Sequence, residues 1–328
     1  MTSLILGVDG GGTKTVAALA TLDGELVGRG SSGGSNPQSM GIESAARAVE
    51  EAIEGALKAA NARREDIAAS AFGMSGADFD RGRRLVEATV GSLGSFGRTF
   101  VENDTLLVLR LASKELVGVG LVSGTGINCI GLDRSGRRIQ IGGMGAVSGD
   151  LGSASDLAEL AIAEAWRQVD GRTVATDLGG AVLDAFGTRD LEAIAEAWGS
   201  ASPRVPSVVS ALFACARARD PAALSVLGVA ARRLGEAAAT CAVRLGLAEP
   251  VVALGGSMFS LPGHEPFRAA VMRDVLKRIP AAHVRAPVEA PVTGALLLAA
   301  DQLGRSELED VLRAAARRSR EPDRTSTE

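Results

Sequence analysis

The chain has 328 residues, which is long enough for about two domains with large cores. Lysine and arginine number 35 and aspartate and glutamate 39, so the formal net charge is −4 and there is no basic surplus for binding a nucleic-acid backbone. Aromatic residues make up only 3% and tyrosine is absent, which also argues against base-stacking surfaces.

The cysteine content and the N-terminus indicate the compartment. Cys129, Cys215 and Cys241 stand far apart with no CxxC pair, so neither a zinc nor an iron–sulfur motif is present. A sparse, odd number of cysteines fits a reducing environment. The N-terminus lacks the basic region of a signal peptide, and no apolar run reaches the length of a membrane span. We therefore expect a cytoplasmic protein that binds neither nucleic acid nor membrane.

Three strands open the chain, and strands then alternate with helices. The Asp23-Gly24 pair is a hairpin signal between the second and third strands. The expected elements of this half are strands at 4–8, 15–22 and 25–30, a helix at 41–60, a strand at 67–72, a helix at 80–93, a strand at 98–102 and a helix at 106–112.

The same opening then recurs. The expected elements of the second half are strands at 116–122, 127–132 and 137–141, helices at 154–169, 177–186, 205–218 and 222–246, a strand at 251–254, a helix at 264–278, a strand at 282–285, and helices at 291–301 and 305–316.

This order predicts an α/β fold of two domains, each with a mixed sheet led by a β-meander and flanked by helices, facing each other across a cleft. We place the first domain at 1–115 and the second at 116–316, and the last helices of the second domain could pack back on the first. The polar residues 317–328 are expected to form a disordered tail.

Glycine is abundant, at 41 residues, and much of it is clustered. The first cluster follows the first strand, where consecutive glycines can offer several free N–H groups to an anion. Asp9 ends that strand and is placed to hold Mg²⁺ through water. A plain glycine-rich turn is an equally open interpretation, and no Walker motif is present. The candidate phosphate-binding residues here are Gly10, Gly11, Gly12, Thr13, Lys14 and Thr15.

A second cluster occupies the same place in the second half. Two such turns could hold one polyphosphate from both sides, although each is a weak signal alone. Its residues are Ser123, Gly124, Thr125 and Gly126. A later apolar strand ends in Gly255, Gly256 and Ser257, which would admit a flat ring such as adenine. In isolation, a simple strand exit is the better interpretation of that segment.

Two further segments contain chemically useful residues. Asp104 follows the strand at 98–102, where open α/β sheets bind ligands, and is a candidate general base or, equally, a helix N-cap. The glycine-rich stretch 142–153 suits a loop around a small polar ligand, or a linker. The GxGxxG match at 28–33 is not followed directly by a helix, so we reject it as a dinucleotide site.

Taken together, the segments resemble the N-acetylglucosamine kinase branch of the actin-like ATPase and sugar kinase superfamily, which includes BadF/BadG/BcrA/BcrD-type ATPases. The stretches that carry the resemblance are GVDGGGTKT (7–15), GSNP (34–37), GMSGAD (73–78), ENDT (102–105), SGTGINC (123–129), GGMGAVSGDLGS (142–153) and LGGS (254–257).

The resemblance implies two actin-like, ribonuclease H-like domains, ATP and Mg²⁺ as cofactors, and often a homodimer. It places Asp9 near the metal, Thr13 and Thr125 on phosphates, Gly255 and Gly256 at the adenosine, and Asp104 as catalytic base. The implied sugar contacts are Asn36, Ser75, Gly76, Asn103, Asp104, Gly143, Met144, Gly145 and Asp150.

The expected function is transfer of the γ-phosphate of ATP to the 6-hydroxyl of an amino sugar or hexose, most simply N-acetylglucosamine or glucosamine. One alternative is an ATPase that activates a radical dehydratase or reductase, although the cysteine spacing gives no cluster motif. The other is a non-catalytic sugar sensor, which would not need Asp104. Leu151 stands where the family usually has Glu, and Met144 where its mammalian kinases have Trp, so the sugar stays open.

Overall fold

The computed structural model describes residues 3–198 and 203–319 of the chain. It divides into two compact units, one made of Met1–Gly118 and Pro287–Glu328 and the other of Val119–Ala286. The change of unit at Gly118 lies three residues after the boundary placed at 115, and the helices after Pro287 belong with the first unit. None of the helices within the described part of the chain combines the length and apolar character that a membrane crossing requires.

The first unit is a five-stranded mixed sheet in the order β3-β2-β1-β4-β5, in which β1, β2 and β3 are antiparallel and β1, β4 and β5 parallel. Its strands and helices are β1 (Leu4–Gly10), β2 (Lys14–Thr21), β3 (Leu26–Gly33), α1 (Pro37–Met40), α2 (Ile42–Ala60), β4 (Ile67–Met74), α3 (Asp80–Gly91), β5 (Arg98–Glu102), α4 (Thr105–Ala112), α12 (Pro291–Gln302) and α13 (Glu309–Arg318).

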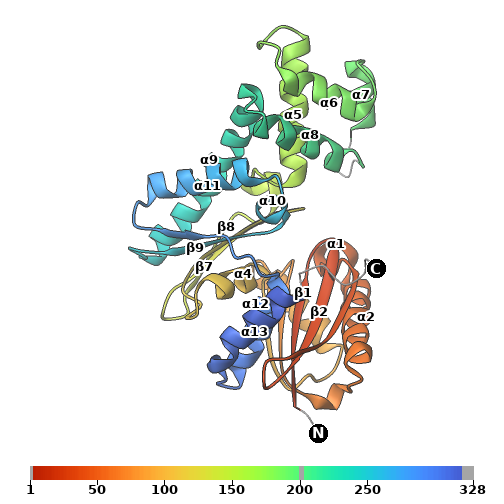
Figure 1. Cartoon of the computed structure of the whole chain (residues 1–328), viewed down its shortest axis with the longest axis vertical. Coiled ribbons are helices and arrows are strands. Elements are labelled where there is room, and N and C mark those ends of the chain that lie inside the picture. Colours follow the sequence, from red (N-terminus) through yellow and green to blue (C-terminus); the bar gives the residue numbers. More distant parts are fainter. Residues whose placement is uncertain (1–2, 199–202, 320–328) are drawn as a thin grey trace, which may run out of the picture. The chain divides into compact units, whose positions relative to one another are not determined.

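Alternation along β1 gives this sheet two buried faces. Leu6 and Val8 pack in one core with α2 and α3, whereas Ile5 packs in another with α4 and α12. Figure 1 shows α12 and α13 on one side of this sheet and α2 on the other. The strand is therefore apolar on both faces, as the run at 4–8 predicts.

The glycines of the rejected GxGxxG match have a packing role in β3. A Cβ on Gly28 would lie 2.2 Å from the Ala56 carbonyl oxygen, and one on Gly30 would lie 2.1 Å from that of Ala52. Only glycine lets helix α2 approach the strand this closely. Close packing against α2 therefore explains the glycines at 28 and 30, and a nucleotide-binding role is not needed to explain them.

A buried cation links the last helices to α4. Arg110 on α4 is 1% exposed, and its Nε lies 2.7 Å from Asp301 Oδ2 while its Nη2 lies 3.1 Å from Glu309 Oε2. A buried charge of this kind requires charged partners. These ion pairs therefore hold the C-terminal helices α12 and α13 against helix α4 of the first unit.

The second unit repeats the strand order of the first. Its sheet runs β10-β9-β6-β7-β8, with β7 and β8 antiparallel and β6, β9 and β10 parallel. The prediction of a meander-led mixed sheet in each half is therefore confirmed. Its strands and helices are β6 (Gly118–Ser123), β7 (Ile127–Leu132), β8 (Arg138–Ile141), α5 (Ala154–Val169), α6 (Asp177–Phe186), α7 (Leu191–Ala197), α8 (Val205–Arg217), α9 (Pro221–Leu245), β9 (Val251–Gly255), α10 (Ser257–Ser260), α11 (Glu265–Arg278) and β10 (His283–Arg285).

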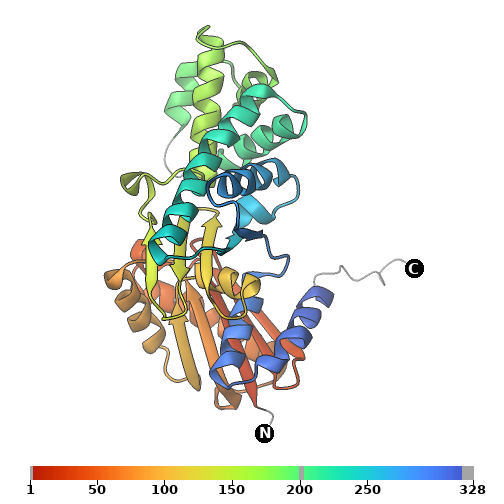
Figure 2. The same ribbon diagram turned by 90° about the vertical axis from the view of Figure 1, so that its left-hand side faces the viewer.

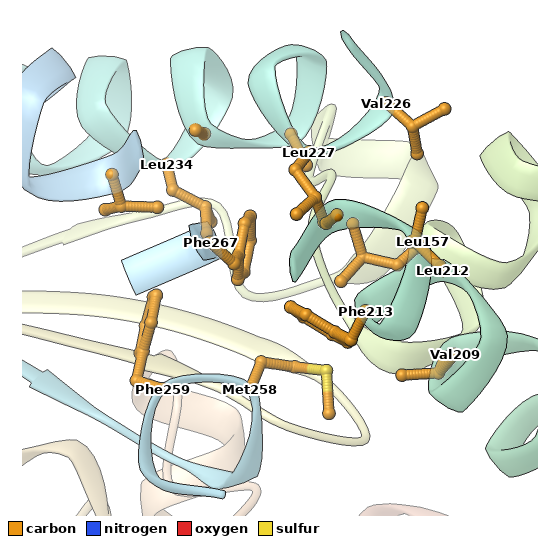
Figure 3. Packing of buried hydrophobic residues seen from close by; sticks show 14 of the residues in the cluster. Leu157, Val209, Leu212, Phe213, Val226, Leu227, Leu234, Met258, Phe259 and Phe267 are labelled. Carbon is orange, nitrogen blue, oxygen red and sulfur yellow. The ribbon is translucent and has the colours of Figure 1, made fainter. Parts of the chain in front are cut away.

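The helices of this unit form one large core with its sheet. Within the unit, α9 packs on β7, β8 and α11, and Figure 2 shows the green helices α5–α8 gathered at one end of it. Phe259 and Phe267 stack with their centroids 5.6 Å apart, and Phe213 packs edge-on to Phe267 (Figure 3). Aromatic side chains thus fix the segment just after β9 against α8 and α11.

The remaining differences from the sequence-based elements are small. The short helices α1, α7 and α10 were not expected, because each is too short to show a helical period. Helix α13 ends at Arg318, two residues inside the expected tail, so the tail boundary at 317 is wrong. The rest of that tail, 320–328, lies outside the described residues.

Candidate active site

In the first unit, parallel pairing brings the ends of three strands to one edge of the sheet. Asp9 on β1 pairs with Gly73 on β4, and Gly73 pairs with Glu102 on β5. The residues that follow β4 and β5 therefore gather beside Asp9. This edge holds the first glycine loop, Ser75 and Asp104, as expected for a ligand site in an open α/β sheet.

The first glycine loop is a tight β1–β2 turn. The Gly11 N–H donates to the Lys14 carbonyl at 2.9 Å, and the Gly11 carbonyl accepts from the Ser35 N–H at 3.0 Å. A Cβ on Gly10 would lie 2.5 Å from Met74 Sδ, whereas one on Gly12 would meet nothing within 4 Å. None of the three loop glycines has a left-handed φ. Gly10 is thus explained by packing, while Gly12 faces open space where a ligand has room.

The loop is fixed to its neighbours by Thr15. The Thr15 side chain is fully buried, with its Oγ1 2.8 Å from both the Ser35 Oγ and the Gly33 carbonyl. Thr15 is therefore a structural residue of the loop, which differs from the phosphate contact predicted for it.

Two carboxylates at this edge have strongly perturbed proton affinities. Burial raises the pKa of Asp9 to about 7, and the nearby Lys14 partly offsets this rise. Burial, together with the nearby charges of Asp9 and Asp78, also raises the pKa of Asp104 to about 7. Carboxyl groups with a pKa near neutrality, gathered at a sheet edge, are typical of proton-transfer sites.

The alternative role of Asp104 as a helix cap is not what the geometry shows. Asp104 occupies the N-cap position of α4, but its side chain makes no capping hydrogen bond. The Thr105 N–H instead donates to the Asn103 Oδ1 at 2.9 Å. The carboxylate of Asp104 is thus not used as a cap.

The predicted sugar contacts of the first unit lie together. The Asn36 Oδ1 accepts from the Gln38 N–H at 2.9 Å, and its Nδ2 donates to the Ser75 Oγ at 3.3 Å. Gly76 has a φ of +89°, and a Cβ there would lie 2.4 Å from the Asn36 Oδ1. The fully buried Asn103 lies between Glu102 and Asp104 on the same edge.

Sequence reasoning missed two side chains that join these residues. Asp78 is 4% exposed and accepts from Asn103 Nδ2 at 3.1 Å and from Gln38 Nε2 at 3.4 Å. Gln38 Nε2 also donates to the Gly76 carbonyl at 2.8 Å. Asp78 lies in the GMSGAD stretch, so a signal was present, but its partners are distant in sequence.

The second glycine cluster lies beside the end of β9 in the second unit. Val122 on β6 pairs with Gly255, so the turn at 123–126 and the Gly255–Ser257 segment are neighbours. Gly256 has a φ of +91°, and a Cβ there would lie 2.2 Å from the Ser123 carbonyl oxygen. The Gly124 N–H donates to the Gly126 carbonyl at 2.9 Å, which closes the turn. Two of the predicted nucleotide segments therefore form one local structure.

The glycine-rich loop at 142–153 is organised around Asp150. The Asp150 Oδ2 accepts from the N–H groups of Gly143 and Gly145, each at 2.9 Å, and from the Ser148 Oγ at 2.8 Å. Met144 is 53% exposed beside it. One carboxylate oxygen of Asp150 is thus bound within the loop, which leaves Oδ1 as the atom that could meet a hydroxyl.

The predicted residues therefore form two sets, one in each unit. The first contains Asp9, the β1–β2 turn, Asn36, Ser75, Gly76, Asn103 and Asp104, and the second contains the β6–β7 turn, the 142–153 loop and the end of β9. That both sets act on one ligand across a cleft stays a prediction.

The comparisons with known proteins identify the family. The BadF/BadG/BcrA/BcrD ATPase family matches residues 6–299. An N-acetylmuramic acid/N-acetylglucosamine kinase from Clostridium acetobutylicum is 34% identical over 55% of this chain and 59% of its own length. The chain thus spans less than two thirds of that relative. A glucosamine kinase from Vibrio cholerae is 28% identical over 68% of this chain and 74% of its own length.

A solved structure gives the same picture for the fold. A candidate N-acetylglucosamine kinase from Chromobacterium violaceum superposes with a TM-score of 0.69 at 27% identity, covering 90% of this chain and 99% of the other. At this coverage the similarity extends over both units.

Proposed function

Because the chain belongs to the BadF/BadG/BcrA/BcrD ATPase family, we propose that it is an ATP-dependent sugar kinase. The proposed reaction is transfer of the γ-phosphate to the 6-hydroxyl of an amino sugar or hexose, with N-acetylglucosamine and glucosamine as the leading substrates. Relatives named as kinases of these sugars support the substrate class. We also propose that it works in the cytoplasm and as a homodimer.

The observation that best supports the proposal is the environment of the Asp104 carboxyl group. Its pKa of about 7, its freedom from capping and its place beside the glycine loop suit a general base. As the sugar oxygen attacks the γ-phosphorus, Asp104 would accept the hydroxyl proton. The new bond joins the sugar oxygen to phosphorus, the bond to the β–γ bridging oxygen breaks, and ADP leaves. The backbone N–H of Gly12, beside the space that a side chain would otherwise fill, would stabilise charge on the phosphates.

Asp9 is the residue that fits Mg²⁺. A carboxylate whose pKa is raised by burial is costly to ionise, and a nearby cation would offset that cost. Among residues 3–198 and 203–319, no group of three or more His, Cys, Asp or Glu side chains could hold a metal. A single carboxylate acting through water would suit Mg²⁺, which keeps several waters and binds substrate phosphates. Mg²⁺ would supply charge neutralisation on the phosphates.

The structure supports the kinase over the alternative of a dehydratase activator. Cys129, Cys215 and Cys241 are all buried in the core of the second unit. The Cys129 thiol interacts with Cys241, and this contact together with burial raises its pKa well above the usual value, which disfavours the metal-binding thiolate. A sugar sensor, the other alternative, would gain nothing from a base with the properties of Asp104.

The glycine loop gives a test of nucleotide binding. Replacing Gly12 with valine places a branched side chain in open space, so the fold should survive while ATP binding weakens. We expect the KM for ATP to rise roughly tenfold, about 1.4 kcal/mol. Gly91→Val is the matched control, since a side chain there also meets nothing, at the end of α3. Unchanged ATP affinity in Gly12→Val by calorimetry would remove the loop from the site.

Sugar choice tests the substrate proposal. The exposed Met144 offers no ring against which an acetyl group could pack, so discrimination at C2 should be weak. In a coupled assay of ADP release, kcat/KM for glucosamine or glucose should lie within about 10³-fold of that for N-acetylglucosamine. A larger preference would show that another residue recognises the acetyl group, and no turnover with any sugar would refute the kinase itself.

A further inference from the structure

A buried carboxylate at the sugar-side edge of the first unit has no role in the proposed reaction. Asp78 is 4% exposed and lies between β4 and α3. Its Oδ1 accepts from Asn103 Nδ2 at 3.1 Å, and its Oδ2 accepts from Gln38 Nε2 at 3.4 Å. A buried charge needs such donors, so Asp78 holds both amides in place.

These bonds form a continuous path between two parts of the site. On one side, Gln38 Nε2 also donates to the Gly76 carbonyl at 2.8 Å, and the Gln38 N–H donates to Asn36 Oδ1 at 2.9 Å. On the other side, Asn103 Oδ1 accepts from the Thr105 N–H at 2.9 Å. The path thus runs from the expected sugar contact Asn36, through Asp78, to the residues on either side of Asp104.

The groups that hold Asp104 belong to residues close to it along the chain. Its side chain makes no capping bond, and its carbonyl accepts the Leu107 N–H at 3.1 Å. The orientation of its backbone therefore follows from how Asn103 and Thr105 are held. We propose, on the basis of the sugar kinase function above, that Asp78 is a positioning residue that sets the catalytic carboxylate of Asp104 against the sugar-binding loop.

The two oxygens of Asp78 allow its two links to be separated. An asparagine at 78 has a single acceptor oxygen. Asn103 cannot turn its amide to compensate, because its Oδ1 already accepts from Thr105. The new oxygen must therefore face Asn103, which leaves two NH₂ groups opposed at Gln38. Asp78→Ala breaks both links, and Asp78→Asn breaks mainly the Gln38 link. Gln38→Ala also breaks that link and leaves Asn103 paired, but it removes the hydrogen bond to the Gly76 carbonyl as well.

The test measures kcat and the sugar KM at pH 8.5, above the raised pKa of Asp104, so that the base is ionised in every variant. We expect Asp78→Ala to lower kcat at least tenfold. Asp78→Asn should restore kcat to within about threefold of wild type but keep a raised sugar KM, and Gln38→Ala should resemble Asp78→Asn. ATP affinity should stay within twofold throughout. Asp80→Asn, which removes an exposed charge two residues away, should change nothing.

A double-mutant comparison separates positioning from general structural damage. In an Asp104→Asn background, Asp78→Ala should cost less than about twofold further in kcat, because it acts through Asp104. An equal loss in both backgrounds, or no rescue by Asp78→Asn, would overturn the inference. If Asp78→Ala does not fold, unchanged sugar KM in both Asp78→Asn and Gln38→Ala would also overturn it.

A second readout does not depend on kinase activity. Hydrogen exchange of the Thr105 amide in the full chain should be faster in Asp78→Ala than in wild type, and unchanged in Asp80→Asn. Unchanged exchange would contradict the link. A wild type that phosphorylates no sugar would instead refute the proposed function, whereas an active wild type with an insensitive Asp78→Ala would refute only this inference.

Discussion

Asp104→Asn is expected to lower kcat by at least about 10²-fold while the KM for ATP changes little. Asparagine preserves the size and hydrogen bonding of the side chain but cannot accept the hydroxyl proton. Steady-state kinetics with N-acetylglucosamine or glucosamine measure the loss. Near-normal turnover would show that Asp104 is not the general base.

The pH profile of the wild type belongs to the same prediction. A base must be deprotonated to act, so a pKa raised to about 7 predicts that kcat/KM rises with pH up to about 7 and falls about tenfold per unit below it. Because Asp9 also titrates near 7 and the two interact, the observed midpoint belongs to the pair. A midpoint near 4, the ordinary value for an aspartate, would contradict the environment described for Asp104.

The same substitution should stabilise the protein at neutral and alkaline pH. The folded state raises the pKa of Asp104 from 3.8 to about 7, so the cost of this group to folding grows as the pH rises between these two values and is complete above pH 7. Removing the charge relieves a cost on the order of 2 kcal/mol, after allowance for partial exposure. A higher Tm together with lost turnover in Asp104→Asn would separate loss of chemistry from loss of fold.

Gly256→Ala is expected to raise the KM for ATP by at least about 10²-fold, or about 2.7 kcal/mol. The new Cβ would lie 2.2 Å from the Ser123 carbonyl oxygen, so the β6–β7 turn or the end of β9 must move. Both are nucleotide segments in the proposed function. The residue also has a φ of +91°, which penalises any side chain.

Gly246→Ala is the control for that backbone penalty. Gly246 ends α9 with a φ of +70°, and a Cβ there meets nothing within 4 Å. Both variants therefore lose stability through the backbone, but only Gly256→Ala moves the turn. Calorimetric titration with a non-hydrolysable ATP analogue tests the difference. Equal ATP affinities in the two variants would exclude the end of β9 from the nucleotide site.

Much of the fold could be predicted because its signals are local. The apolar run of β1, the hairpin at Asp23-Gly24 and the repeated meander follow from strand periodicity and turn residues. The return of α12 to the first unit could not be assigned, because it depends on contacts such as Arg110 with Asp301, 191 positions apart. Helical periodicity shows that a segment is buried but not which sheet covers it.

Some residues of the candidate site could likewise be predicted from the sequence, and others could not. Glycine clusters after strands mark Gly12 and Gly256 from sequence alone, since only glycine leaves such space or tolerates such a φ. The roles of Asp78, Gln38 and Thr15 could not be predicted, because they arise from side chains that meet only after folding. The position of Asp150 could be predicted from the sequence, but its role in ordering its own loop could not. One of its carboxylate oxygens accepts hydrogen bonds from that loop.

The most direct measurement is the fate of the γ-phosphate when the purified full chain is given ATP, Mg²⁺ and N-acetylglucosamine or glucosamine, followed by ³¹P NMR. A sugar kinase predicts one sugar 6-phosphate for each ADP formed, with negligible ADP in the absence of sugar. ADP accompanied only by inorganic phosphate, at a rate that does not depend on sugar, would contradict the account and identify the protein as an ATPase.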